Sequence, residues 1–367
     1  MSTPEIVHVM GWRSQQYGSF ERFLVALASR CAEQGARTHL VFPSEPASPE
    51  FANDVSAELH VVPSPSRLWD PRFALQLGKL LRRVGASHVH AHFGVDAYHA
   101  VATGVLLRVP ARYGTKHITP GSADRYAVRV RHRWLGDHVR TLFAVSYQVR
   151  SALLELGVPA RKVEVCHLGV DPAAYGRNDA VRAEVRRELD IPEGSRVILT
   201  TSHLRAGKGV ELLPGLAAAL TKAGEDVTVV VAGDGPLRAE LEAQAEESAP
   251  GRLRLLGVRQ DIPRLLASAD LFVFPSYGAE GLPLGPLEAL AAGVPVVSTT
   301  VSDLGSLLAG SALLTAPGDG GALAAACKRL LSDAALANSL RARGLELVSG
   351  RLNVARAAER HVQHYLG

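Results

Sequence analysis

The sequence predicts an α/β protein with two doubly wound, Rossmann-like parallel sheets in tandem. Short apolar runs rich in β-branched residues alternate with longer segments of helical period, which is the pattern of βα units around a buried parallel sheet. The pattern stops near residues 171–176 and then restarts. The length of 367 residues also suits two domains of roughly 150 to 200 residues better than one large core.

The first domain is expected at residues 1–171. Its strands are predicted from apolar runs that are too short to form helices of ordinary length. These runs are 6–10, 38–42, 59–63, 88–92, 111–115, 141–146 and 163–167. Segments of helical period, such as 19–34 and 96–107, lie between them.

The second domain is expected at residues 172–350, after a boundary where a glycine, a proline and small residues interrupt both periods. Its strands are predicted at 197–202, 227–232, 254–256, 271–275 and 294–298. The last segment, 351–367, is expected to form a helix that packs back on the first domain. Open parallel sheets bind ligands at the carboxyl ends of their strands, so we expect a ligand in a central cleft that both domains face.

The net charge, the cysteines and the lack of long apolar runs limit which ligands this protein is expected to bind and where in the cell it is expected to lie. The formal charge of +4 favours an anionic ligand and is too small to predict nucleic-acid binding. Cys31, Cys166 and Cys327 are odd in number and far apart, so they are expected to be buried apolar residues rather than zinc ligands or disulfides. The sequence has no recognisable secretory signal and no apolar run of about 18 residues, which predicts a cytoplasmic protein.

The loop after the first predicted strand, GWRSQQYGSFERF, places Gly18 and Ser19 before a helix that carries Glu21. Two small residues at a helix start leave backbone N–H groups accessible to an anion. The structural alternative is a simple N-cap by Ser19.

The loop TTSHLRAGKGVELL carries His203, Arg205 and Lys208 just before a helix. The helix dipole opposes cations at this end, so a bound diphosphate would account for them. A solvated basic turn is the alternative.

A third loop, VVVAGDGPLRAEL, contains Gly233 and Gly235 and looks at first like a dinucleotide-binding turn. That fingerprint needs another glycine three residues after Gly235, where this chain has Arg238. NAD binding is therefore disfavoured.

The stretch PSYGAEGLPLGPLEALAAGVPVVST places Glu280 and Glu288 on either side of a helix start. Pro286 suits the first helical position, so Gly285 is expected as the N-cap and Glu288 as the third residue, where a glutamate can bond to the cap N–H. That role is the structural alternative for Glu288. Glu280 lies too far before the cap, and a carboxylate there suits sugar hydroxyls, while the N–H groups of the helix start suit phosphate. Sugar hydroxyls and phosphate together describe a sugar nucleotide. The other residues expected around it are Gly281, Leu282 and Leu284.

Taken in order, these segments resemble glycosyltransferase family 4, retaining enzymes of the group 1 type with the GT-B fold. The matching motifs are HAHFG, VSYQVRSALLELGVPARKVEVCHLGVD, LRAGKGVELL, VVVAGDGPLRAEL, GVRQDIPRLLASADLFVFPS and EGLPLGPLEALAAGVPVVST. The resemblance extends from about residue 6 to the final helix. It implies two Rossmann-like domains, the first binding the acceptor and the second the nucleotide sugar.

The resemblance also implies roles for individual residues. Glu280 would contact the transferred sugar near its anomeric carbon, Glu288 would bind the ribose hydroxyls of the donor, and Lys208 would neutralise its diphosphate. Gly18 and Ser19 stand where the family often has two glycines whose amides approach the phosphates.

Two further positions follow from the same resemblance. His117, in GTKHI, matches a histidine beside the donor sugar, and a plain polar loop histidine is its alternative. Where the family usually has GRL, this chain has SHL at 202–204, so His203 replaces the arginine that accompanies Lys208. Arg205 is the other candidate for that arginine's role.

The implied activity is transfer of a hexose, with retention, from a UDP or GDP sugar to a hydroxyl of a small-molecule, saccharide or glycolipid acceptor. The expected catalytic residues are Glu280, His117 and Lys208. No metal or other cofactor is expected, because cations and N–H dipoles would supply positive charge at the diphosphate. The alternatives are a sugar-nucleotide epimerase and a non-catalytic nucleotide-sugar-binding protein. A pyridoxal-phosphate phosphorylase is disfavoured, since no lysine of the second domain has a persuasive context.

The segment SADRYAVRVRHRWLGDHVR, residues 122–140, is the expected contact for an anionic membrane surface or a phosphorylated acceptor. As a helix it would have an apolar stripe beside a basic one. The stripes consist of Tyr126, Val130 and Trp134, and of Arg125, Arg129 and Arg133. We favour a more ordinary arrangement, in which this helix packs its aromatic stripe on the sheet.

Overall fold

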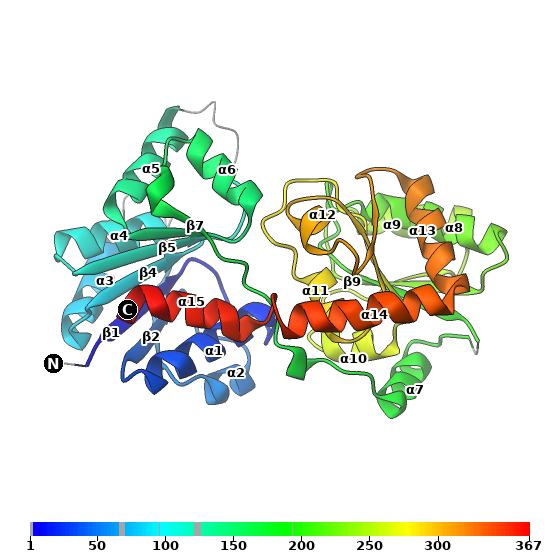
Figure 1. Cartoon of the computed structure of the whole chain (residues 1–367), viewed down its shortest axis with the longest axis horizontal. Coiled ribbons are helices and arrows are strands. Elements are labelled where there is room, and N and C mark those ends of the chain that lie inside the picture. The colour runs from blue at the N-terminus through cyan, green and yellow to red at the C-terminus, as the bar shows by residue number, and fades with distance from the viewer. Residues whose placement is uncertain (1–2, 66–69, 95, 121–125, 193) are drawn as a thin grey trace. The chain divides into compact units, whose positions relative to one another are not determined.

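The computed structural model describes residues 3–65, 70–94, 96–120, 126–192 and 194–367. The chain divides into two compact units. One consists of Met1–Leu168 together with Val354–Gly367, and the other of Gly169–Asn353. Each contains one parallel sheet with helices packed on it (Figure 1). The predicted α/β class with two doubly wound sheets is confirmed.

In the first unit, the described strands pair in the order β3-β2-β1-β4-β5-β6-β7, and all neighbours are parallel. The strands are β1 (Glu5–Met10), β2 (Arg37–Phe42), β3 (Glu58–Val61), β4 (His88–His92), β5 (Ala111–Lys116), β6 (Thr141–Ala144) and β7 (Val163–Val165). The winding reverses between β1 and β4. Ligands of such sheets bind at the carboxyl ends of the strands on either side of this reversal.

The helices of the first unit start at residues that favour helix ends. The Asp70 side chain accepts a hydrogen bond from the Arg72 N–H at the start of α3, and Gly85 ends that helix with φ of 65°. The Ser146 side chain caps α6 in the same way. The helices are α1 (Ser19–Glu33), α2 (Pro49–Asp54), α3 (Pro71–Val84), α4 (Asp96–Leu106), α5 (Tyr126–His138), α6 (Tyr147–Glu155), the 3₁₀ turn η1 (Ala160–Lys162) and α15 (Val354–Leu366).

The last helix of the chain, α15, belongs to the first unit and packs along α1 (Figure 1). Its Tyr365 and His361 are buried. The Tyr365 carbonyl oxygen lies 3.0 Å from His88 Nε2 on β4, and Arg360 forms an ion pair with Glu164 on β7. The C-terminal segment therefore completes the core of the unit that begins with β1.

In the second unit, the described strands pair in the order β10-β9-β8-β11-β12-β13, again all parallel. They are β8 (Arg196–Thr201), β9 (Val227–Ala232), β10 (Leu253–Leu255), β11 (Leu271–Phe274), β12 (Val296–Thr299) and β13 (Leu313–Thr315). The winding reverses between β8 and β11, so the loops that follow these two strands are neighbours. The edge strand β13 was not predicted.

The core of the second unit lies where α8 and α13 cover the central strands. Leu216 of α8 and Leu323 of α13 pack with Ile198, Val229 and Val273 of the sheet. The helical segments of this unit are η2 (Pro172–Ala174), α7 (Asp179–Glu188), η3 (Val210–Leu212), α8 (Leu213–Lys222), α9 (Arg238–Ser248), α10 (Ile262–Ser268), α11 (Gly285–Ala291), α12 (Leu304–Leu307), α13 (Gly320–Ser332) and α14 (Ala334–Ser349).

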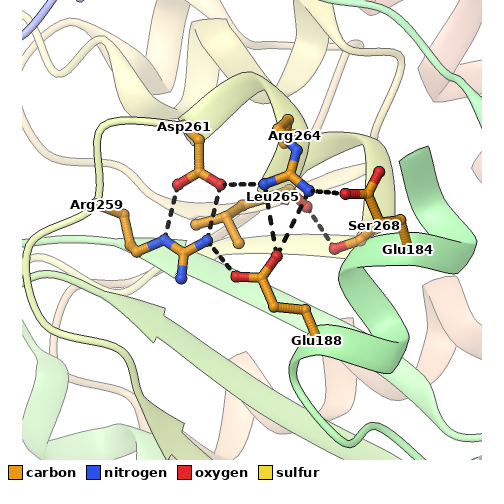
Figure 2. A network of polar contacts seen from close by, with 7 residues as sticks. All are labelled: Glu184, Glu188, Arg259, Asp261, Arg264, Leu265 and Ser268. Atoms are coloured by element: carbon orange, nitrogen blue, oxygen red, sulfur yellow. Dashed lines mark hydrogen bonds and ion pairs between the residues drawn. The ribbon is translucent and has the colours of Figure 1, made fainter.

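A network of ion pairs holds α7 against α10 (Figure 2). Arg259 contacts Asp261 at 2.7 Å and Glu188 at 2.8 Å, and Arg264 contacts Asp261 at 3.0 Å and Glu184 at 2.9 Å. Of the residues of α7, Val185 alone is buried. This helix therefore depends on charges as much as on apolar burial for its position.

The remaining expectations about the chain concern cysteine and membranes. All three cysteines are free and buried, as predicted. Burial raises the pKa of the Cys31 thiol to about 11 and that of Cys166 to about 12, which keeps both uncharged. No helix among the described residues is both long and apolar enough to span a bilayer.

Candidate active site

The clearest pair of site residues lies at the winding reversal of the second sheet. Lys208 follows β8 and Glu280 follows β11, and the Lys208 Nζ lies 2.7 Å from Glu280 Oε1. The two side chains are 18% and 12% exposed. The Ser276 hydroxyl donates to the same carboxylate oxygen at 2.7 Å. The structure thus brings together two of the residues proposed for catalysis, at the edge where a ligand is expected.

Glycines hold the two loops against each other. The Gly207 carbonyl oxygen accepts hydrogen bonds from the N–H groups of Tyr277, at 3.0 Å, and Gly278, at 2.7 Å. Gly209 has φ of 70°, and a Cβ at this position would lie 2.0 Å from the Pro275 carbonyl oxygen. Only glycine allows such an approach. Lys208 therefore sits between two glycines whose backbones are bonded to or packed against the Glu280 loop.

Helix α11 begins one residue earlier than expected. Gly285 is its first residue and Leu284 its N-cap, without a side-chain cap bond. Glu288 is then the fourth helical residue and not the third, the position that its alternative role in capping assumed. A Cβ at Gly285 would lie 2.9 Å from Thr201 Oγ1 and 3.3 Å from a ring carbon of Phe272. The helix start therefore lies directly against β8 and β11, on the same edge as the Lys208–Glu280 pair.

The other donor-loop residues occupy different environments. Gly281 and Leu282 are buried, and the Gly281 carbonyl oxygen accepts a hydrogen bond from the Ser302 hydroxyl. His203 and Arg205 are exposed, and Arg205 Nη1 lies 3.4 Å from the Ala206 carbonyl oxygen. The substitution of either cation for the family's arginine stays a prediction.

The glycines of the GDG turn are explained by packing within the protein. A Cβ at Gly233 would lie 1.8 Å from the Ser202 carbonyl oxygen, and one at Gly235 would lie 2.4 Å from the Leu204 carbonyl oxygen. The Leu204 N–H also donates to the Asp234 carbonyl oxygen at 2.9 Å. These glycines thus bring the turn close to the backbone of the His203 loop, and they require no bound dinucleotide.

In the first unit, His117 follows β5 and contacts a second histidine. His117 Nε2 lies 3.1 Å from Nδ1 of His92, the last residue of β4. Phe93 stacks on the His117 ring at 4.0 Å and 16°. Phe93 has φ of 41°, a left-handed conformation that is strained for a bulky residue. The alternative of a plain loop histidine does not describe this environment. The signal in the sequence for these contacts was the HAHFG motif, which contains His92 and Phe93.

The start of α1 uses one of its backbone amides within the protein. Gly18 is the N-cap and Ser19 the first helical residue, so the structural alternative, a cap by Ser19, is wrong. The Gly18 N–H donates to Glu21 Oε2 at 3.1 Å, and the Ser14 hydroxyl donates to Glu21 Oε1 at 2.7 Å. Burial raises the pKa of Glu21. A protein carboxylate therefore occupies the amide that was expected to face an anion.

The exposed side of α5 contradicts the expected packing of its aromatic stripe. Tyr126 is 82% and Val130 47% exposed, whereas His132, Leu135 and Gly136 are buried. The prediction that this aromatic stripe packs on the sheet is therefore wrong. The part of the predicted segment at 122–125, with Arg125, lies outside the described residues.

Comparison with known proteins identifies the family. The model of "Glycosyltransferase Family 4" matches residues 20–174, and that of "Glycosyl transferases group 1" matches residues 195–333. A curated relative, 2-deoxystreptamine glucosyltransferase of Streptomyces kanamyceticus, is 30% identical over 313 residues, 78% of this chain and 79% of the relative. The chain belongs to the group 1, family 4 glycosyltransferases.

This glycosyltransferase has further relatives of similar length and solved structures of the same fold. Alpha-D-kanosaminyltransferase of Streptomyces kanamyceticus is 27% identical over 315 residues, 80% of each chain. A crystal structure of Anabaena Alr3699/HepE in complex with UDP and glucose covers 99% of both chains with a TM-score of 0.82 and 19% identity. WaaG, described as a glycosyltransferase of lipopolysaccharide biosynthesis, covers 99% of this chain and 100% of its own with a TM-score of 0.74 and 18% identity. The glycosyltransferase therefore has the GT-B fold.

Proposed function

We propose that this glycosyltransferase moves a hexose from a UDP or GDP sugar to an acceptor hydroxyl with retention of configuration. The observation that carries the proposal is the Lys208–Glu280 pair, a cation and a carboxylate 2.7 Å apart at the winding reversal of the second sheet. The names of relatives support both nucleotides. One is a UDP-Gal-dependent galactosyltransferase of Escherichia coli, and another is a GDP-mannose-dependent mannosyltransferase of Mycobacterium tuberculosis.

In this proposal, negative charge that develops on the leaving diphosphate is stabilised by Lys208 and by the start of α11. The first N–H groups of a helix have no partner inside it, so those near Leu284 and Gly285 suit phosphate oxygens. His203 or Arg205 supplies a second cation. No metal or other cofactor is required by this arrangement of charges.

The carboxylates act on the sugar and the ribose. Glu280 lies beside the transferred hexose, where its second oxygen meets a ring hydroxyl while Oε1 keeps its bonds to Lys208 and Ser276. Glu288, on the half-buried face of α11, binds the ribose hydroxyls.

The acceptor is a hydroxyl of a small molecule, a saccharide or a glycolipid, and we place the enzyme in the cytoplasm with peripheral membrane contact through α5. The exposed Tyr126 and Val130 beside Arg129 and Arg133 support that contact. Relatives are named for 2-deoxystreptamine and for a diphosphoundecaprenol lipid, so both chemical classes belong in the acceptor panel.

The experiment is incubation with UDP and GDP hexoses and acceptors of both classes, with mass spectrometry of the product and NMR of its anomeric centre. We expect one nucleotide series to give an α-linked product from an α-linked donor. Lys208→Met should lower kcat by about 10²–10³-fold, as does removal of a group that stabilises developing charge.

The matched control is Lys222→Met, an exposed lysine at the end of α8, which should retain activity. Epimerised donor without acceptor would replace the proposal by the epimerase alternative. Nucleotide binding that raises the melting temperature, without turnover of any donor, would favour the non-catalytic binding protein.

A further inference from the structure

Three imidazole rings form a chain across the first sheet. His8 Nδ1 on β1 lies 3.2 Å from His92 Nε2 on β4, and His92 Nδ1 lies 3.1 Å from His117 Nε2 after β5. The ring centroids are 5.5 and 5.4 Å apart and the planes differ by 25° and 32°. The rings therefore meet edge to edge, as N–H···N hydrogen bonds require. The parallel order β1, β4, β5 places them side by side.

Each of these hydrogen bonds has two possible directions. His8, at the end of the row of rings farthest from His117, decides between them. His8 Nε2 is buried and has no hydrogen-bond partner within the described part of the protein. A hydrogen on this nitrogen would be a buried donor without an acceptor, which folded proteins strongly avoid, whereas a buried acceptor without a donor is better tolerated. The His8 hydrogen therefore resides on Nδ1 and points at His92.

The direction is transmitted along the chain because each ring is neutral. Burial lowers the pKa of His8 and of His117 to about 3 and that of His92 well below its usual value. A neutral imidazole has one N–H, so a ring that accepts at one nitrogen must donate from the other. His92 accepts at Nε2 and donates from Nδ1. His117 then accepts at Nε2 and carries its hydrogen on Nδ1.

We propose that His8 and His92 act as positioning residues that hold His117 in the Nδ1–H tautomer, so that His117 presents a hydrogen-bond donor, and not a basic lone pair, at Nδ1. The tautomer follows from the chain of rings alone, while its effect on the rate of transfer rests on the proposed function.

Neighbouring aromatic rings hold His117 in the orientation that this chain needs. Phe93 covers one face at 4.0 Å, and Phe20 meets the ring at 5.1 Å and 84°. Rotation of the imidazole would break both contacts and the bond to His92. The strained backbone of Phe93 thus has a use, because it places the phenyl ring over His117.

A metal ion is the competing explanation for this cluster, since ligand atoms of His8, His90 and His92 lie within 4.8 Å of one another. The geometry disfavours it. Both His90 nitrogens contact hydroxyl groups, those of Tyr365 and Thr115. His90 also lies face to face with His92 at 4.3 Å and 6°, so their lone pairs run parallel and do not converge on a common point.

The experiment is NMR of the full chain with ¹⁵N-labelled histidine, because long-range ¹H–¹⁵N correlations distinguish the two tautomers. We expect His117 to carry its hydrogen on Nδ1 at pH 7. His8→Phe removes the first donor and keeps the ring volume, and it should give a mixture of tautomers at His117. A triad histidine that loses the partner fixing its tautomer becomes about 10⁴-fold slower. His117 moves no proton in this proposal, so kcat should fall only about tenfold, with KM for the donor little changed.

The matched control is His361→Phe, another buried histidine of the first unit, whose Nδ1 contacts the Ala357 carbonyl oxygen instead of the chain. It should leave the His117 tautomer unchanged. A hydrogen on Nε2 of His117 in the unaltered protein, or loss of the His8 and His92 N–H signals on addition of one equivalent of Zn²⁺, would overturn the proposal. The Nδ1 tautomer in a protein that transfers no sugar would leave the relay standing and refute the proposed function alone.

Discussion

At the scale of single residues, the position of Lys208 is set by glycines and not by its own side chain. Gly207 and Gly209 both have positive φ, and each lies within van der Waals distance of the Glu280 loop. These two glycines flank Lys208, whose side chain reaches the Glu280 carboxylate. The Lys208–Glu280 contact should therefore be sensitive to backbone changes at these glycines as well as to loss of either charge.

Gly209→Ala tests this dependence. The new Cβ would meet the Pro275 carbonyl oxygen at 2.0 Å, and a non-glycine residue at φ of 70° costs about 1–3 kcal/mol in addition. We expect a lower free energy of unfolding in urea and a fall in kcat, since Lys208 shifts with the loop.

The control for this variant is Gly215→Ala in α8, where a Cβ would meet nothing within 4 Å. This change should stabilise the protein by about 0.5–1 kcal/mol through helix propensity. Equal effects of the two substitutions would show that the approach of Gly209 to Pro275 does not matter.

The sequence predicted site residues best where a charged side chain directly follows a predicted strand. Lys208 and Glu280 were predicted as site residues because they follow strands, but their direct contact depends on β8 and β11 being neighbours. The cap positions failed by one residue at both Ser19 and Gly285. Gly18 and Glu21 already have the spacing of a cap and its third helical residue, so this bond was readable from the sequence.

At the scale of elements, α7 shows how charges can fix a helix that buries little. Arg259 and Arg264 reach its Glu184 and Glu188, and Asp261 bridges the two arginines (Figure 2). A shared network is worth more than isolated surface pairs, because each charge is already held by its neighbours.

Asp261→Asn should lower the free energy of unfolding by about 1 kcal/mol at pH 7. Hydrogen bonds from Arg259 lower the pKa of Asp261 in the folded protein. The stabilisation is therefore complete above the unfolded pKa of about 3.9 and is lost as the pH falls through the folded pKa. Denaturation curves at pH 7 and in acid should show the variant and the parent converging in acid.

The control is Glu247→Gln, an exposed residue of α9, which should change stability by less than about 0.5 kcal/mol. A difference between Asp261→Asn and the parent that is unchanged in acid or in 1 M salt would contradict an electrostatic origin.

The elements themselves were largely predictable, because buried parallel strands appear as short apolar runs. Most predicted strand boundaries agree with the structure to within one or two residues. The edge strand β13 was missed although β10, which is equally short, was predicted, so strand length does not account for the difference. The prediction for α5 was wrong for a different reason. Its sequence pattern shows that an apolar stripe exists but not which side of the helix faces the sheet.

At the scale of the whole molecule, the two reversals of winding account for where the candidate site residues gather. The motifs predicted loops that follow strands, and the strand order decides which of these loops meet. This order is a long-range property, and for that reason the pair of Lys208 with Glu280 and the chain from His8 to His117 were visible in the structure and not in the sequence.

A chain that ends at Asn353 tests the part played by α15 in the first unit. It loses several buried side chains, among them Val362 and Tyr365, and large apolar side chains contribute about 1.5–3 kcal/mol each. The total free energy of unfolding of a domain is only about 5–15 kcal/mol. We expect hydrogen exchange to show loss of protection in β1 and β4, while β8 and β9 keep theirs.

Removal of Gly367 alone serves as the control and should leave both units protected. Protection of β4 that survives the longer truncation would mean that the first unit is complete without its C-terminal helix.

The return of α15 to α1 also constrains how the protein is made. The ribosome releases Leu168 long before it reaches Val354, and at 5–20 residues per second the interval is roughly 10 to 40 s. During that time the newly made N-terminal half exposes the apolar side of α1, while the segment between can fold by itself. The second unit can therefore fold before the first is complete, and chaperones have a defined surface to protect until α15 has been made.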